Sequence, residues 1–508
     1  MNIIVKGIQD KRYERNLQLI ADLFFEDSTL EISAEESADA FEIVITVEID
    51  HGFIHARAAT VDPELSAFRK APYEEKSTEK ESFKQNKNVV SHVFLSILQQ
   101  YTGMTQKWGV LTGIRPTKLM HKQRMNGSPA HKTRTYLKEQ YLITDEKIKL
   151  MEEIVDRQLT MIPDLYEIQE EVSIYIGIPF CPTKCAYCTF PAFAIQGKLG
   201  KVSSFLAGLH YEIQETGRWL KERGIKITTI YFGGGTPTAI TAEEMDALYD
   251  EMYRSFPNVQ NVREVTVEAG RPDTIFPDKL EVLKKWNIDR ISINPQSYTD
   301  ETLKAIGRHH TVQETIDKFH LSRKHGMNNI NMDLIIGLPN EGTAELQHSL
   351  NETEKLMPES VTVHTLSFKR ASQMTLNREK YKVADRTEVE KMMDLAQKWN
   401  KDHGYVPYYL YRQKNILGNL ENVGYAKPGE ESLYNILIME EVQTIIGLGC
   451  GAASKFIDPE TGKITHFANP KDPKSYNDSF IDYTRKKIDY LESIFPKKPQ
   501  EDKKARQI

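Results

Sequence analysis

Hydrophobic and polar positions follow two different patterns along this chain, and the pattern changes near residue 171. Before that point, short β-rich runs such as IIVKGI and the alternating FEIVITVEI from Phe41 precede stretches with helical spacing at 87–103 and 144–160. Alternation of apolar and polar residues indicates half-buried strands, whereas apolar residues three and four positions apart indicate amphipathic helices. Residues 1–165 are therefore predicted to form a small α+β domain.

Between residues 171 and 404, six short β-rich runs alternate with longer amphipathic stretches such as SSFLAGLHYEIQETGRWLKERG. The predicted strands are VSIYIGI (172–178), KITTIYF (226–232), REVTVEA (263–269), DRISIN (289–294), NINMDLI (329–335) and SVTVHTL (360–366). Successive β-then-α units join parallel strands through right-handed crossovers. The expected fold class is α/β, with an open or partial (β/α)6 barrel whose chemistry lies beyond the carboxyl ends of its strands.

The last part of the chain is predicted to be a C-terminal extension of this barrel. Residues 405–495 contain YYLYRQKN, the Gly-rich IIGLGCGAASKF and a helical stretch that continues through Tyr490. Residues 496–508, PKKPQEDKKARQI, are charged and interrupted by proline. Terminal segments of this composition bury little apolar surface, so a disordered tail is expected there.

Composition and charge argue against nucleic acid as the main partner and against a membrane span. The 508 residues include 66 Lys and Arg against 72 Asp and Glu, a net charge of −6, which offers no large basic field to a phosphate backbone. Apolar runs fall short of the ~18–20 residues that span a bilayer, and MNIIVKGIQDKRYERN lacks the apolar stretch of a signal peptide. We therefore expect a cytoplasmic protein without a membrane span, for which nucleic acid is not the principal partner.

Three of the four cysteines fall within eight residues, as Cys181, Cys185 and Cys188. Thiolates this close indicate a metal site in a reducing compartment rather than a disulfide scaffold. Sequence-local zinc motifs come as two pairs of ligands, whereas a [4Fe–4S] cluster takes one ligand per iron. Three cysteines would leave one iron free to bind a small molecule. A zinc site that recruits Cys450 or a histidine is the alternative, and Cys450 otherwise fits a small buried hydrophobe.

Other unusual residues follow the ends of the predicted strands. Gly233–Gly235 follow the second strand, Glu268 ends the third, Gln296 lies just past the fourth, and Asp333 lies near the end of the fifth. The glycines either let the backbone approach a ligand closely or form a tight turn. The carboxylates suit hydroxyl or ammonium groups, and Gln296 suits hydroxyls or an adenine edge. Each of these side chains could instead be a satisfied structural polar group.

These residues carry a resemblance to a known family. The Cys-x3-Cys-x2-Cys spacing resembles the signature of the radical S-adenosylmethionine (SAM) enzymes. Its context, Tyr175-Ile-Gly-Ile-Pro-Phe-Cys181 followed by GGGTPT, VEA, NPQS, LKAIGRHH and DLIIGLP, is similar to the oxygen-independent coproporphyrinogen III oxidase family. The resemblance covers about residues 171–455, and LTGIRPTK is similar to the branch that carries an extra N-terminal domain.

The resemblance implies two cofactors, a [4Fe–4S] cluster and SAM. It implies that Cys181, Cys185 and Cys188 are the metal ligands. The implied SAM contacts are Tyr175, Tyr187, Gly234, Gly235, Thr236, Glu268, Gln296, Arg308, Asp333 and Ala453. Of these, Tyr175 is also the expected catalytic residue, and Ala453 aligns only loosely.

The implied reaction is the oxidative decarboxylation of coproporphyrinogen III to protoporphyrinogen IX. An electron from the reduced cluster cleaves SAM to methionine and a 5′-deoxyadenosyl radical, which takes a hydrogen from a propionate side chain. Loss of CO2 and one electron then leaves a vinyl group. The implied partners are a tetrapyrrole substrate and an electron donor such as a flavodoxin or ferredoxin.

Two positions depart from the established decarboxylases. Gly177 stands where they have a histidine, and Phe190 stands where they have a fourth cysteine. Neither of those residues belongs to the three-ligand cluster, so SAM cleavage is expected to survive. The departures concern the decarboxylation step instead. Radical SAM chemistry on another tetrapyrrole, including the opening of the haem ring, is therefore an alternative function.

A haem-binding chaperone of the same family is a further alternative. Those chaperones carry a His-Asn-x-x-Tyr-Trp motif in the tail, and this chain reads Tyr434-Asn435-Ile-Leu-Ile-Met at the corresponding place, which argues against a chaperone. In the N-terminal region, WGVLTGIRPTKLM places Pro116 where a helix can begin. Arg115 and Lys118 beside it are expected to grip the carboxylates of the substrate, or else to be solvated surface charges.

Overall fold

The computed structural model describes residues 1–25, 27–34, 40–75, 78–112, 115–194, 201–367, 372–413 and 416–495. The tail expected at 496–508 lies outside the described residues. The chain divides into two compact units, Met1–Glu153 and Ile154–Ile508, so the division falls within helix α5 (Asp145–Met161). Within the described ranges, no helix combines the length and the apolar character needed to cross a membrane.

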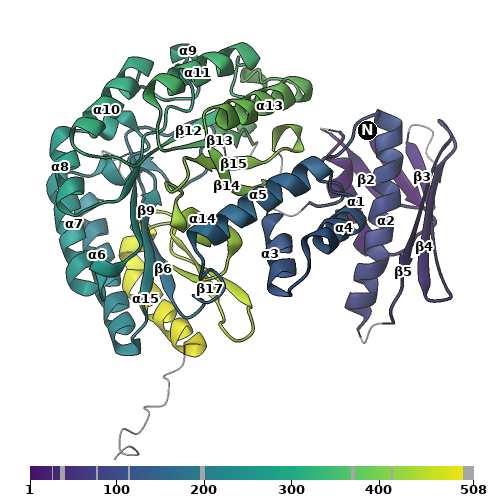
Figure 1. Ribbon diagram of the computed structural model, residues 1–508, viewed down its shortest axis with the longest axis horizontal. Coiled ribbons are helices and arrows are strands. Elements are labelled where there is room, and N and C mark those ends of the chain that lie inside the picture. Colours follow the sequence, from purple (N-terminus) through teal and green to yellow (C-terminus); the bar gives the residue numbers. More distant parts are fainter. Residues whose placement is uncertain are drawn as a thin grey trace, which may run out of the picture. The chain divides into compact units, whose positions relative to one another are not determined.

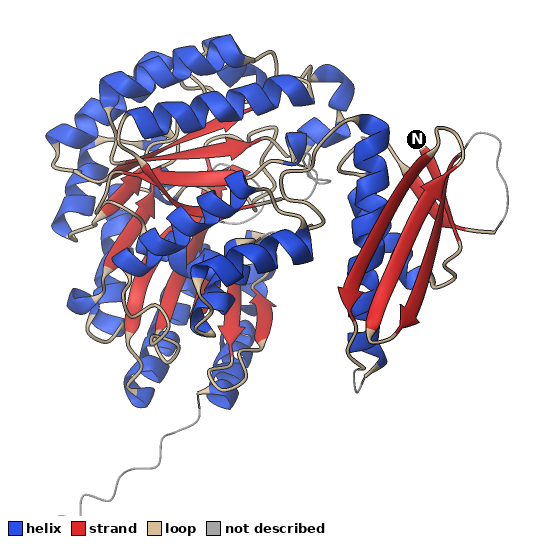
Figure 2. Ribbon diagram, turned by 45° about the vertical axis from the view of Figure 1, so that its right-hand side comes forward, coloured by secondary structure: helices blue, strands red, loops and turns tan. Residues whose placement is uncertain are grey.

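The first unit is built on a five-stranded sheet in the order β2-β1-β3-β4-β5. Its strands are β1 (Asn2–Lys6), β2 (Thr29–Ile32), β3 (Phe41–Asp50), β4 (Phe53–Thr60) and β5 (Leu65–Pro72), and its longer helices are α1 (Glu14–Ala21), α2 (Glu79–Thr102), α3 (Thr117–Met125) and α4 (Ala130–Tyr141). The buried faces of β1, β3 and β4 form one apolar core with α1 and α2, and Figure 2 shows the sheet and the long α2 side by side. Helix α3 begins directly after Pro116.

The second unit contains an eleven-stranded sheet whose middle is the predicted barrel. The six predicted strands appear as β6 (Val172–Ile178), β9 (Ile227–Gly234), β10 (Glu264–Glu268), β11 (Arg290–Ser292), β12 (Ile330–Ile336) and β13 (Ser360–Thr365). They pair in parallel in chain order. The predicted α/β class and partial (β/α)6 barrel are therefore confirmed.

Helices follow the barrel strands and cover the outside of the sheet (Figure 1). They are α6 (Val202–Arg223), α7 (Ala242–Ser255), α8 (Pro277–Lys285), α9 (Asp300–Ala305), α10 (Val312–Lys324), α11 (Thr343–Leu356), α12 (Gln373–Leu376) and α13 (Arg386–Asp402). Local signals set their limits. Helix α7 begins with a capping box between Thr241 and Glu244, and α6 ends at Gly224, whose φ of 65° suits glycine.

The C-terminal extension adds strands to both edges of the barrel sheet. Its elements are β14 (Val406–Tyr411), β15 (Asn422–Ala426), α14 (Leu433–Glu440), β16 (Thr444–Gly449), β17 (Ala453–Ile457), β18 (Ile464–Ala468) and α15 (Pro473–Ile494). Strand β15 pairs antiparallel with β13, whereas β16 pairs in parallel with β6, the first barrel strand. Residues 405–495 thus complete the sheet around the barrel strands.

A buried ion pair holds the end of β16 in place. The Glu212 carboxylate accepts hydrogen bonds from Lys487 Nζ at 2.9 Å and from the backbone N–H of Gly449 at 2.6 Å, and both charged side chains are fully buried. A buried charge persists when it is paired and hydrogen-bonded in this way. The network fixes α6, β16 and α15 to one another beside the carboxyl end of β6.

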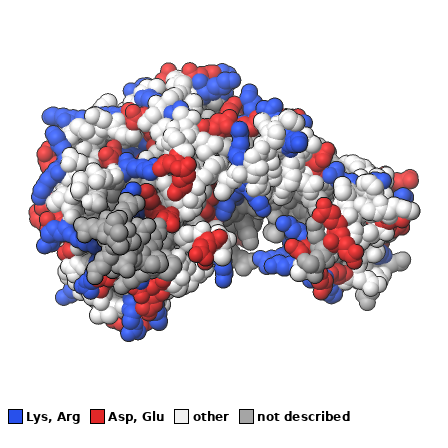
Figure 3. All heavy atoms as spheres, turned by 60° about the horizontal axis from the view of Figure 1, so that its bottom comes forward, with Lys and Arg blue, Asp and Glu red and all other residues white. Residues whose placement is uncertain are grey.

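The charged side chains of the surface are of both signs. On the face drawn in Figure 3, Lys and Arg are interspersed with Asp and Glu. This mixture agrees with the small net charge of −6.

Candidate active site

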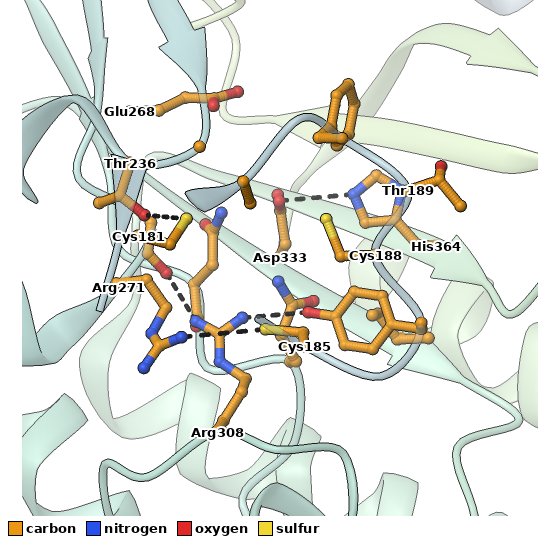
Figure 4. Close-up of a pocket in the computed structure, with 18 of the residues that line it drawn as sticks. Cys181, Cys185, Cys188, Thr189, Thr236, Glu268, Arg271, Arg308, Asp333 and His364 are labelled. Carbon is orange, nitrogen blue, oxygen red and sulfur yellow. Dashed lines mark hydrogen bonds and ion pairs between the residues drawn. The ribbon is translucent and has the colours of Figure 1, made fainter. Parts of the chain in front are cut away.

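A pocket lies at the carboxyl ends of the barrel strands, where the sequence predicts the chemistry. Most of the predicted site residues line it: Cys181, Cys185, Cys188, Tyr187, Gly234, Gly235, Thr236, Glu268, Gln296, Arg308 and Asp333. They come from the loop after β6, from the ends of β9, β10, β11 and β12 or just beyond them, and, for Arg308, from the segment after α9; Figure 4 shows the labelled ones around one space. The fold therefore brings together residues spread over about 150 positions of sequence.

The three cysteine side chains enter this pocket from one loop. Cys181 ends the short strand β7 (Phe180–Cys181), which pairs with β8 (Phe193–Ala194), and its Sγ lies 3.3 Å from Thr236 Oγ1. Burial raises the pKa of the Cys181 thiol to about 11, while Thr236 acts in the opposite direction. A thiol in this environment becomes a thiolate when a cationic group binds it.

The donor set of this loop fits an iron–sulfur cluster. In the described part of the chain, no group of three or more His, Cys, Asp and Glu side chains is close enough to hold one metal ion. A cubane cluster does not need that convergence, because each thiolate binds a different iron. Cys450 is buried and is absent from the described lining of the pocket.

The glycine-rich end of β9 forms a tight turn whose residues also line the pocket. Gly234 has a φ of 105°, and the backbone N–H of Gly235 donates to Ile178 O at 2.8 Å. A Cβ on Gly235 would lie 2.6 Å from Phe180 O. Glycine is therefore required by the packing of this turn against the cysteine loop, and the same residues line the pocket.

Glu268 is a half-buried acid at the end of β10. Its Oε1 accepts a hydrogen bond from Tyr231 Oη at 2.5 Å. Burial raises the pKa of Glu268 to about 7, with the Tyr231 bond acting against this and Asp333 acting with it. Tyr231 stacks on Tyr434 with ring centroids 4.4 Å apart and on Tyr175 at 6.1 Å. Glu268 is thus held against an aromatic stack and titrates near neutral pH.

Asp333 is the second acid of the pocket and remains ionised. It accepts a hydrogen bond from Asn331 Nδ2 at 2.7 Å, and His364 Nε2 lies 3.4 Å from its Oδ2. Burial acts to raise the pKa of Asp333, but His364 and the hydrogen bonds outweigh it, so the pKa lies below its usual value. His364 Nδ1 in turn lies 3.2 Å from Tyr411 Oη.

Arg308 connects three separate segments of the pocket through hydrogen bonds. Its Nη1 donates to Tyr187 Oη at 3.1 Å, and its Nη2 donates to the carbonyl oxygens of Gly270 and Asn294 at 2.7 and 2.9 Å. Nearby, Asn294 Oδ1 and Gln296 Oε1 are buried without a hydrogen-bond partner in the described residues. A buried acceptor left unpaired costs about 1–3 kcal/mol. Both are therefore suited to the hydroxyl and amine donors of a ligand.

Four predicted residues are not among those that line the pocket. Tyr175 lies in the aromatic stack behind Glu268. Ala453 is exposed at the start of β17, where it pairs with Ala468. Arg115 and Lys118 are half-buried in the first unit, at the start of α3, whereas every lining residue that the structure describes belongs to the second unit. Their assigned roles stay predictions.

The departure at Gly177 has a structural counterpart. A Cβ on Gly177 would lie 3.2 Å from Cys450 O and 3.3 Å from Ala452 Cβ. A side chain at this position would therefore press on the turn after β16, which would have to shift by a few tenths of an ångström. Phe190, at the position of the expected fourth cysteine, lines the pocket and is 58% exposed.

Sequence reasoning missed several polar residues of the pocket. They are Arg271, Asn294, His364 and Tyr411. Arg271 directly follows the recognised VEA run and Gly270, so its position at a strand end was a usable signal. His364 lies inside the predicted strand SVTVHTL, and no local pattern indicates that it reaches Asp333 on the neighbouring strand.

Comparison with known proteins finds chains similar to this one. Residues 175–352 match the family described as the Radical SAM superfamily. The chain is 66% identical to the oxygen-independent coproporphyrinogen-III oxidase-like protein HemZ of Bacillus subtilis, over 98% of this chain and 99% of that protein. It is 30% identical to the heme chaperone HemW of Bacillus subtilis, over 55% of this chain and 70% of that protein.

A solved structure shares the fold. Coproporphyrinogen III oxidase (HemN) from Escherichia coli, described as a radical SAM enzyme, aligns with a TM-score of 0.51 and 19% identity. The alignment covers 67% of this chain and 74% of that chain. At this identity the likeness shows the barrel architecture.

Proposed function

The chain belongs to the radical SAM superfamily and, within it, to the oxygen-independent coproporphyrinogen-III oxidase-like proteins, and we propose that it decarboxylates the propionate side chains of coproporphyrinogen III. One observation carries the proposal: three cysteines and the polar residues of four strand ends line a single pocket. The cofactors are those of the superfamily, a [4Fe–4S] cluster and SAM, for which the Cys181, Cys185 and Cys188 motif is present.

The residues of this chain have separable tasks in that reaction. Bound in the pocket, the two cofactors supply the one-electron chemistry that removes a hydrogen atom from an unactivated C–H bond. The three thiolates hold the cluster. Asn294 and Gln296 offer buried acceptors to SAM, and Asp333 offers a carboxylate that remains ionised. The acceptor atoms Asn294 Oδ1 and Gln296 Oε1 are buried, so the part of a ligand that they bind would be shielded from water.

A haem chaperone function is the less favoured alternative. Tyr434, which aligns with the start of the chaperone motif, is 2% exposed and is stacked on Tyr231. A side chain buried in this way does not offer a haem ligand to solvent. The electron donor we propose is a small reductant such as a flavodoxin or ferredoxin.

Anaerobic turnover tests the proposal. The protein is reconstituted with iron and sulfide and is incubated with SAM, reductant and coproporphyrinogen III, and the products are identified by mass. The expected products are protoporphyrinogen IX, methionine and 5′-deoxyadenosine, with none of these formed by Cys185→Ala. SAM cleavage with unchanged coproporphyrinogen III would instead assign the protein to another tetrapyrrole, and haem is the substrate to supply next.

A further inference from the structure

Arg271 lies against one of the three cysteines and belongs to none of the predicted cofactor contacts. It lies three residues after the end of β10 and is 4% exposed. Its Nη1 lies 3.9 Å from Cys185 Sγ, and the same nitrogen donates to Thr183 Oγ1 at 3.0 Å and to Thr183 O at 3.2 Å. The guanidinium therefore contacts both a cysteine ligand and the backbone of its loop (Figure 4).

The other side of the same guanidinium is paired with one carboxylate. Arg271 Nε donates to Asp273 Oδ1 at 3.0 Å, and Nη2 donates to Asp273 Oδ2 at 2.8 Å. Bidentate pairing fixes the plane of a guanidinium. Asp273 is 23% exposed and stands two residues from Arg271 on the short turn after β10. Asp273 thus fixes one side of the guanidinium, and the remaining nitrogen, Nη1, is held by Thr183 and lies beside Cys185 Sγ.

We propose that Arg271 is a positioning residue that raises the reduction potential of the cluster through Cys185, and that Asp273 limits this effect. Potentials of iron–sulfur clusters depend on net charge and on hydrogen bonds to the sulfurs. Reduction adds a negative charge to the cluster. A cation and an N–H donor at a cysteine sulfur stabilise that added charge, and a nearby carboxylate opposes it.

Arg308, the other buried arginine of the pocket, also acts on Cys185 through its charge, but its hydrogen bonds go elsewhere. Its Nη1 is used by Tyr187 and its Nη2 by two backbone carbonyls. Among the described residues, it is Arg271 whose guanidinium donates to a cysteine sulfur. The inference concerns the cluster alone, so it stands whichever tetrapyrrole is the substrate.

The functional consequence is control over which reductant can deliver the electron. A higher potential makes the reduced cluster accessible to weaker donors, and a lower potential restricts reduction to stronger ones. The Arg271–Asp273 pair therefore determines how strong a reductant the protein needs as its electron donor.

Two substitutions with opposite expected signs test the proposal. Arg271→Met removes the charge and the donor at nearly constant length. We expect at least a tenfold fall in the equilibrium constant for cluster reduction, which is a shift of about 59 mV to lower potential for a one-electron couple. Asp273→Asn leaves Arg271 in place without its counter-charge, and the midpoint should move to higher potential.

The measurement is a redox titration of the reconstituted full-length protein without SAM, followed by the electron paramagnetic resonance signal of the reduced cluster. Iron counts per chain confirm equal loading. Arg290→Met is the matched control, because Arg290 is 3% exposed and is hydrogen-bonded to Asn329 at the amino end of β11. Its midpoint should equal that of the parent.

The outcomes separate the proposal from a merely structural role. If Arg271→Met loads poorly, Asp273→Asn and Arg271→Lys still decide it, since the lysine keeps the charge and should keep most of the potential. An unchanged midpoint in Arg271→Met would overturn the proposal. A shift of the same sign in Arg271→Met and Asp273→Asn, or an equal shift in Arg290→Met, would overturn it as well.

Discussion

Glu268 carries a proton in the folded protein at a pH where an ordinary carboxyl group has lost it. Its pKa is about 7 against an ordinary value of 4.5, mainly because it is buried. A raised pKa contributes stability that is complete below about pH 4.5 and is lost as the pH rises through 7. At 1.36 kcal/mol for each unit, the loss is about 3 kcal/mol.

Glu268→Gln should therefore remove this pH dependence from the apoprotein. We expect the free energy of unfolding of the parent to fall relative to the variant between pH 5 and pH 8, because the glutamine cannot ionise. Urea unfolding of both proteins at the two pH values measures the difference. Parallel pH profiles would contradict the assignment of this titration to Glu268.

The three loop cysteines should hold the cluster without Cys450. Cys450 is 3% exposed, and burial raises its pKa to about 12, so its thiol stays protonated in place. Cys185→Ala should lose the iron and the absorbance of the reconstituted cluster, whereas Cys450→Ala should keep both. Iron and sulfide counts per chain decide this, and the reverse result would assign the ligands wrongly.

At the scale of elements, the turn after β16 packs against the end of β6 through glycines. Gly449 has a φ of 88°, and a Cβ there would lie 2.3 Å from Gly177 O. Its backbone N–H is fixed by the buried Glu212. The close approach of the two strands therefore depends on the absence of a side chain at Gly449, and a side chain at Gly177 would make a tight contact.

Gly177→His should destabilise the protein and should not improve decarboxylation. Its Cβ would press on Cys450 O at 3.2 Å, and overpacking of this kind costs about 1–3 kcal/mol. Gly449→Ala should cost more, because it adds a strained φ to the clash. Gly462→Ala is the control, with a positive φ of 66° and open space around it. Thermal unfolding of the three variants ranks them, and a loss in Gly462→Ala as large as that in Gly449→Ala would refute the packing argument.

Local patterns predict elements well where strands pair in chain order. The run VSIYIGI became β6 without a change of limits, and the other five barrel strands lie within two residues of their predicted ends. The β16 strand could not be placed in this way, because its partner β6 is far away in sequence and pairing of that kind leaves no local periodicity. His364 was missed for the same reason, since its partner Asp333 lies on the neighbouring strand.

At the scale of the whole molecule, the first unit ends inside a helix. The second half of α5 belongs to the second unit: Arg157 is paired with Glu431, and Gln158 Nε2 donates to Tyr408 O at 2.9 Å. Ile162 and Leu165, which follow α5, are buried in an apolar cluster with Tyr408 and Leu437. A protein cut at residue 165 would therefore lack part of the core of its own barrel unit.

Two truncations test how far the units are independent, and they bear on the predicted substrate contacts of Arg115 and Lys118. A chain of residues 145–508 keeps all of α5 and should fold, bind the cluster and cleave SAM. A chain of residues 166–508 loses Ile162 and Leu165, each worth about 2–5 kcal/mol in large-to-small core substitutions, and should unfold at lower urea concentration or fail to load iron.

If the first unit grips the carboxylates of the tetrapyrrole, the 145–508 chain should bind coproporphyrin more weakly than the full chain while its affinity for SAM is unchanged. Arg115→Ala and Lys118→Ala in the full chain should show the same selective loss, since guanidinium and ammonium groups pair with carboxylates. Fluorescence titration with coproporphyrin measures the binding. Equal porphyrin affinity in the full chain, in both variants and in residues 145–508 would show that the second unit alone binds the substrate, and that the first unit serves another purpose.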